Sequence, residues 1–252
     1  MGLDGFVHCR CWQDGKMTPP ACLAGLIVQE PEGLTLSVPY KDNTELYDVL
    51  DEWQSEACPH DDMTAALESV GNWASYRAFQ HAVAGQGFPV LNDVLPNGNG
   101  GIVEAAEAAA ALDELRRFAR HSDFGEEAVL CDAVTGAVVW QQIRAFGGAN
   151  VMSAEAEMGV DLDGFFVRRG DVEVFRAVRF SQEVVDGGQV RFSDGPVAVT
   201  LPVKPVAGQA GVPGDLVVRS RLVGAGSFTP VVGALVRLFE ASVETGNPVV
   251  WC

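Results

Sequence analysis

The feature that most constrains this 252-residue chain is a set of four metal-binding residue types arranged in two close pairs. Cys9 and Cys11 lie two residues apart near the amino terminus, and Cys58 and His60 lie two residues apart 49 positions later. Zinc sites in proteins combine thiolate and imidazole ligands that come in such pairs. We therefore predict a zinc site whose four ligands are Cys9, Cys11, Cys58 and His60.

Each pair needs a bend in the chain before its side chains can share one ion. On an extended strand Cys9 and Cys11 leave the same face, with Cβ atoms about 7 Å apart. Two thiolates on one zinc must approach to about 4 Å, so the chain has to curl. A turn signal at residues 13–15 supplies that bend. Pro59 cannot continue a helix, so we expect Cys58 and His60 in a turn between two helices.

Three other interpretations of these residues stay open at this point. Free cysteines are often small core residues, which would make the cluster ordinary packing. A disulfide is a second alternative, although a cytosolic chain disfavours it. In the third alternative, His60 caps or solvates the start of a helix.

Composition indicates a folded, non-membrane protein. Hydrophobic residues make up 48% of the chain and charged residues 20%, a balance typical of globular domains. The sequence has no apolar run of about 18 residues and no basic, apolar leader, so we expect a cytoplasmic protein. Arginine outnumbers lysine fourteen to three, which is typical of a GC-rich bacterial source.

The formal net charge of −17 is concentrated in the first part of the chain. Residues 1–163 contain 26 acidic and 8 basic residues, whereas residues 164–252 contain 8 and 9. Residues 42–68 contain nine acidic residues and neither lysine nor arginine. Such a field repels nucleic acid and attracts a basic protein partner. The alternative is that the acidic surface only maintains solubility.

The order of predicted elements indicates an α+β fold with a mostly antiparallel sheet, helices concentrated in the first half, and one C-terminal helix. We expect a single compact domain over residues 1–252, with an internal boundary near 122–125 as the alternative. Helices are predicted at 44–57, 61–84, 102–121 and 230–244. Strands are predicted at 3–12, 34–39, 128–132, 137–145, 164–168, 172–180, 189–193, 197–203 and 215–223, with an edge strand at 249–251.

Two functions follow from the zinc prediction. In the first, a structural zinc stabilises an acidic protein that binds a basic partner, as an inhibitor or immunity-type protein would. In the second, the protein is a metal-dependent hydrolase that activates a zinc-bound water, with Asp61 or Asp62 as general base. The sequence contains no Gly-x-Ser-x-Gly or His-Glu-x-x-His motif, so the question of enzymatic activity stays open, as does the oligomeric state.

Overall fold

The computed structural model describes residues 2–252, except for the side chains of Ala145 and Asp186. It confirms the predicted α+β class, because antiparallel sheets accompany a helical first half and a C-terminal helix. The chain forms two compact units. The first unit runs to His121 and resumes at Phe228–Cys252, and the second is Ser122–Ser227. The proposal of one domain over residues 1–252 stays a prediction.

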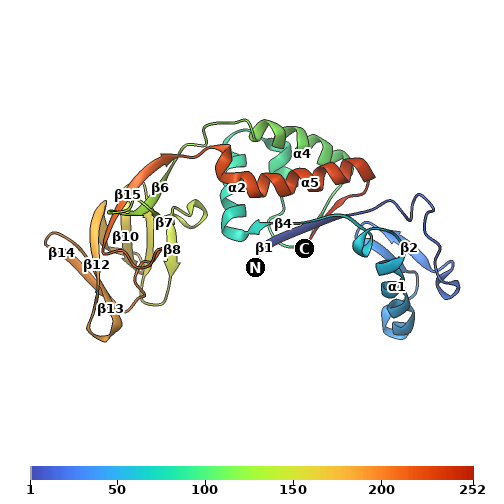
Figure 1. Cartoon of the computed structure of the whole chain (residues 1–252), viewed down its shortest axis with the longest axis horizontal. Coiled ribbons are helices and arrows are strands. Elements are labelled where there is room, and N and C mark those ends of the chain that lie inside the picture. Colours follow the sequence, from blue (N-terminus) through green and yellow to red (C-terminus); the bar gives the residue numbers. More distant parts are fainter. Residues whose placement is uncertain (1) are drawn as a thin grey trace. The chain divides into compact units, whose positions relative to one another are not determined.

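The first unit is built on an antiparallel sheet with the strand order β4-β1-β16-β5 (Figure 1). Its strands are β1 (Gly2–His8), β4 (Thr64–Asn72), β5 (Ile102–Val103) and β16 (Val249–Trp251). The prediction of an edge strand at 249–251 is wrong, because β16 lies between β1 and β5. All three of its side chains are buried, as expected for an interior strand.

Helices pack against this sheet and against one another. They are α2 (Trp73–Gly85), α3 (Pro89–Val94), α4 (Ala105–Phe118) and α5 (Thr229–Thr245). Figure 1 shows α4 and α5 side by side, and α5 also contacts β4 and β1. The Arg237 guanidinium of α5 donates through Nη2 to the Glu68 carboxylate of β4 at 2.7 Å. This pair joins the C-terminal helix to the strand that follows the predicted ligands.

The predicted helix over residues 61–84 is wrong in its first half. Residues 64–72 form strand β4, and only the second half is helical, as α2. Ala, Leu and Glu in β4 are good helix formers, which is why local propensity favoured a helix. Pairing with β1 along the whole strand overrides that preference. The turn that carries Cys58 and His60 therefore joins a helix to a strand.

A separate small lobe lies within the first unit and is here called the hairpin–helix segment, residues 12–57. It contains a hairpin of β2 (Ile27–Glu30) and β3 (Gly33–Leu36), followed by α1 (Thr44–Glu56). Its own core has three buried apolar side chains, those of Leu23, Leu36 and Leu50, with partly buried hydrophobic side chains packed around them. A core this small contributes little stability by itself, and domains of this size usually depend on a metal or disulfide.

The second unit consists of two antiparallel sheets that share one core. The first sheet has the order β11-β10-β9-β8 and the second β14-β13-β12-β15-β6-β7. Aromatic rings from both sheets meet in this core, including Phe165 and Phe180, whose centroids are 4.3 Å apart. The strands are β6 (Glu126–Asp132), β7 (Val138–Gln141), β8 (Ala149–Met152), β9 (Glu157–Asp161), β10 (Gly164–Arg169), β11 (Val172–Ala177), β12 (Arg179–Val185), β13 (Gln189–Asp194), β14 (Val197–Leu201) and β15 (Asp215–Leu222).

Within residues 2–252, no helix combines the length and the apolar character that a membrane span requires.

Candidate metal centre

The pairing of β1 with β4 brings the two predicted ligand pairs to the same place. His8, the last residue of β1, lies opposite Thr64, the first residue of β4. Just beyond this point the Cys9 amide donates to the Met63 carbonyl at 2.7 Å. The residues that follow β1 therefore lie beside the residues that precede β4, although 49 positions separate Cys9 from Cys58.

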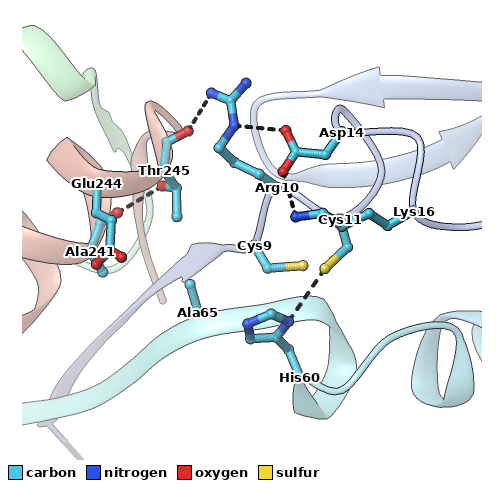
Figure 2. Close-up of a pocket in the computed structure, with 10 residues that line it drawn as sticks. All are labelled: Cys9, Arg10, Cys11, Asp14, Lys16, His60, Ala65, Ala241, Glu244 and Thr245. Atoms are coloured by element: carbon cyan, nitrogen blue, oxygen red, sulfur yellow. Dashed lines mark hydrogen bonds and ion pairs between the residues drawn. The ribbon is translucent and has the colours of Figure 1, made fainter.

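The chain turns sharply after Cys11, as the turn signal at residues 13–15 predicts. The Asp14 amide donates to the Arg10 carbonyl at 2.8 Å, and the Lys16 amide donates to the Cys11 carbonyl at 2.9 Å. Gly15 occupies the turn with φ of 65°, a conformation that glycine adopts without strain. This turn moves Cys11 off the strand direction, so its sulfur lies near that of Cys9 (Figure 2).

The second pair lies in a short connection between α1 and β4. Ala57 ends the helix, Pro59 follows, and a 3-10 turn at Asp61–Met63 leads into β4. Asp62 and Met63 both have positive φ values, 46° and 55°, which are unfavourable for residues other than glycine. The connection is therefore strained at the second and third residues after His60, which is typical of a functional turn.

The four donor atoms lie close together. The sulfurs of Cys9 and Cys58 are 3.8 Å apart, and His60 Nδ1 is 3.5 Å from the Cys11 sulfur and 3.6 Å from the Cys58 sulfur. All four donors fall within 4.8 Å of one another. A tetrahedral zinc with bonds of about 2.3 Å to sulfur and about 2.0 Å to nitrogen separates two sulfurs by about 3.8 Å and sulfur from nitrogen by about 3.5 Å. This cluster could therefore hold a metal ion, and its donor set is consistent with zinc.

Burial makes the Cys9 thiol costly to ionise without a cation. Cys9 and Cys11 are buried, whereas Cys58 is half-buried. Burial, reinforced by the neighbouring thiols, raises the pKa of Cys9 to about 12. A metal ion supplies the positive charge that favours the thiolate, and its binding displaces a proton. Apparent metal affinity should therefore fall as the pH falls.

Apolar side chains pack against the thiols. The rings of Trp12 and Trp53 meet edge to face with centroids 5.7 Å apart. Met17 and Met63 are buried in the same cluster. This apolar packing connects the base of the hairpin–helix segment with the end of β1.

Asn247 is a supporting residue that sequence reasoning missed. It is buried, and its Nδ2 donates to the carbonyls of His8 and Cys9 at 2.8 and 3.0 Å. Its Oδ1 accepts from Gln13 Nε2 at 2.7 Å. Asn247 therefore holds the backbone of His8 and Cys9 and also the side chain of Gln13, which follows the first ligand pair. Its position between a glycine and a proline indicates only an ordinary turn residue.

A pocket of about 320 Å³ opens onto the cluster (Figure 2). Cys9, Cys11 and His60 contribute to its wall, together with Arg10 and the C-terminal end of α5. The Arg10 guanidinium donates to the Thr245 carbonyl at 2.8 Å and forms an ion pair with Asp14. Small molecules can therefore approach the thiols from this side.

Other side chains that could bind a metal have different partners. The ring of His8 is outside the cluster, and its Nε2 lies 2.9 Å from the Glu32 carbonyl oxygen. Asp161 and Glu157 form ion pairs with arginines of the second unit. The fold therefore brings together the four ligands that their spacing predicts, Cys9, Cys11, Cys58 and His60.

Comparison of the chain with protein-family models, with curated proteins and with solved structures finds no match.

Replacing Asp62 tests whether the turn after His60 is strained. The side chain is exposed, so a change acts mainly through the backbone. We expect Asp62→Gly to leave the free energy of unfolding unchanged or to raise it by up to about 1 kcal/mol, because glycine adopts positive φ freely. Asp62→Val should lower it by about 1–2 kcal/mol, since a β-branched residue is disfavoured there. Urea unfolding of both variants checks this, and a valine variant as stable as the glycine variant would contradict it.

Proposed function

We propose that this protein binds one structural zinc ion through Cys9, Cys11, Cys58 and His60, and that it acts by binding a basic protein partner. The observation that carries the metal proposal is the set of donor distances. Sulfur–sulfur and sulfur–nitrogen separations of 3.8, 3.5 and 3.6 Å match those around a tetrahedral zinc. Zinc also suits three thiolates and an imidazole better than magnesium or calcium, which prefer oxygen ligands.

The position of the cluster suggests what the metal does. One ligand pair precedes the hairpin–helix segment and the other follows it, so a bound ion would close the base of this lobe. Fixing the two ends of a long segment is entropically costly, and a metal ion offsets that cost. The lobe needs such stabilisation because the core around Leu23, Leu36 and Leu50 is small.

The proposed partner surface is the exposed face of α1. Five of its side chains are acidic and exposed: Glu45, Asp48, Asp51, Glu52 and Glu56. Among the residues that the structure describes, none of these carboxylates forms an ion pair. An unpaired acidic face attracts cationic surfaces and repels phosphates, so an inhibitor or immunity-type protein with a basic target is the function we favour over nucleic-acid binding.

A metal-dependent hydrolase is the alternative function. Hydrolytic zinc needs an open coordination position, whereas a set of four donors within 4.8 Å of one another favours a closed site. Asp61 and Asp62 are exposed, and neither is among the residues that line the adjoining pocket. We also propose a reducing compartment, the cytoplasm, because all six cysteines are free thiols.

Removing one ligand at a time tests the structural zinc. Cys9→Ala and Cys58→Ala should lose the metal and lower the melting temperature by about 10 °C, because metal-binding energy is folding energy and each kcal/mol shifts Tm by about 2–4 °C in a chain of this size. Metal analysis by inductively coupled plasma, combined with a thermal melt, checks both effects.

Cys22→Ala is the matched control for this experiment, because Cys22 is an exposed cysteine outside the cluster. The control should keep about one zinc per chain and the wild-type melting temperature. If the ligand variants retain the metal, or if the wild-type protein folds fully without one, the proposal is wrong.

Charge reversal on α1 tests the partner surface. We expect the Asp48→Lys, Glu52→Lys double variant to bind a labelled deca-arginine probe at least about tenfold more weakly than the wild type, because it replaces two attractive charges with repulsive ones. Binding of the wild type should also weaken as salt rises. Fluorescence anisotropy at low and high salt measures both effects.

The control reverses two exposed acids of the second unit, in the Glu155→Lys, Asp163→Lys variant. It has the same net charge as the α1 variant. Equal losses in the two variants would mean that the probe responds to the overall charge and not to the face of α1.

A further inference from the structure

The sulfurs of Cys9 and Cys58 are close enough to react with each other, in addition to being two of the candidate metal ligands. They lie 3.8 Å apart, in van der Waals contact, and come from segments on opposite sides of the hairpin–helix segment. The Cys11 sulfur also lies within 4.8 Å of both sulfurs, and it is 3.5 Å from His60 Nδ1. A disulfide requires a sulfur–sulfur bond of about 2.05 Å, so closing the pair takes a movement of under about 2 Å.

An oxidant can reach this pair. The pocket of about 320 Å³ beside the cluster has Cys9 in its wall and is large enough for small molecules such as a peroxide. Among the side chains that line this pocket, the thiols of Cys9 and Cys11 are the groups that a peroxide oxidises most readily. Cys58 is half-buried and is not among the residues that line this pocket, so the oxidant reaches Cys9 first.

We propose that Cys9 and Cys58 are a site of reversible oxidative modification, at which a peroxide converts the two thiolates into a disulfide and thereby releases the metal. The metal release rests on the proposed function, whereas the disulfide rests only on the geometry of the two thiols. A disulfide sulfur is a poor zinc ligand, so oxidation removes two of the four donors at once.

The step balances as follows in atoms and electrons. The Cys9 thiolate attacks one peroxide oxygen, the O–O bond breaks, and the departing hydroxide takes up a proton to become water. The Cys58 thiolate then attacks the resulting sulfenic sulfur, the S–O bond breaks, and a second hydroxide becomes water. Two thiolates, one hydrogen peroxide and two protons give one disulfide and two waters. The sulfurs lose two electrons and the peroxide gains them.

The product has a particular structural consequence. The disulfide joins the same two positions that the metal joins, so it closes the base of the hairpin–helix segment by a covalent bond. The oxidised, metal-free protein should therefore melt well above the reduced, metal-free protein. Oxidation would exchange one cross-link for another and would not unfold the lobe.

The test uses the full chain with the two exposed cysteines outside the cluster changed, Cys22→Ser and Cys252→Ser. Zinc-loaded protein is treated with hydrogen peroxide, and released zinc is followed with a chromogenic chelator. Trypsin separates the three thiols, because Cys9 falls in residues 1–10, Cys11 in 11–16 and Cys58 in 42–77. Mass spectrometry then identifies which peptides are joined.

We expect stoichiometric zinc release, a link between the peptides of Cys9 and Cys58, and reversal by dithiothreitol with added zinc. Cys11→Ser, which spares the pair, should still form the link, whereas Cys58→Ser should not. If zinc binds and peroxide gives no such link, or joins Cys9 to Cys11, the modification site is wrong and the metal proposal survives. If the link forms in protein that never binds zinc, the thiol pair is supported and the metal proposal fails.

Discussion

The antiparallel pairing of β1 with β4 is the interaction on which the candidate centre depends. It ends with His8 opposite Thr64 and continues into the hydrogen bond from the Cys9 amide to the Met63 carbonyl. Without it, the two ligand pairs would be the ends of a loop of about fifty residues with no reason to meet. Asn247 adds a second restraint, since its amide group binds the backbone of Cys9 from the C-terminal side of the fold.

The site was more predictable from the sequence than the elements that support it. The spacing of Cys9, Cys11, Cys58 and His60 depends on ligand chemistry, which is local and specific, and the fold brings these four together. Strand β4 was predicted as a helix because its alanines, leucine and glutamate favour one locally. Its pairing with β1 is a long-range contact that no short window of sequence contains. The contact of Asn247 with His8 spans 239 positions and was unpredictable for the same reason.

Strand β16 illustrates a second limit of sequence patterns. Three consecutive apolar residues at the carboxyl end predict a strand, and a strand is present. Its place inside the sheet depends on pairing with β5. That strand has only two residues, and both lie in a segment whose sequence predicts a helix. The α+β class was predictable, in contrast, because it depends on the order of many elements and tolerates errors in a few.

Charge is important both inside the metal cluster and on the exposed face of α1. Burial disfavours the Cys9 thiolate, so a cation inside the cluster would relieve an unfavourable charge. Outside the cluster, the acidic face of α1 is supported by a lobe whose own core is small. Binding of a partner to this face would therefore depend indirectly on the ion at the base of the lobe. If the lobe is loosely attached, the acidic side chains of α1 occupy less well-defined positions.

The claim that a metal ion fixes the hairpin–helix segment to β1 is tested most directly by hydrogen–deuterium exchange of the zinc-loaded and the chelator-treated protein. The account predicts faster exchange after metal removal in residues 12–57, with α4 and α5 unchanged. Identical exchange in the two forms, or a uniform increase over the whole chain, would contradict it.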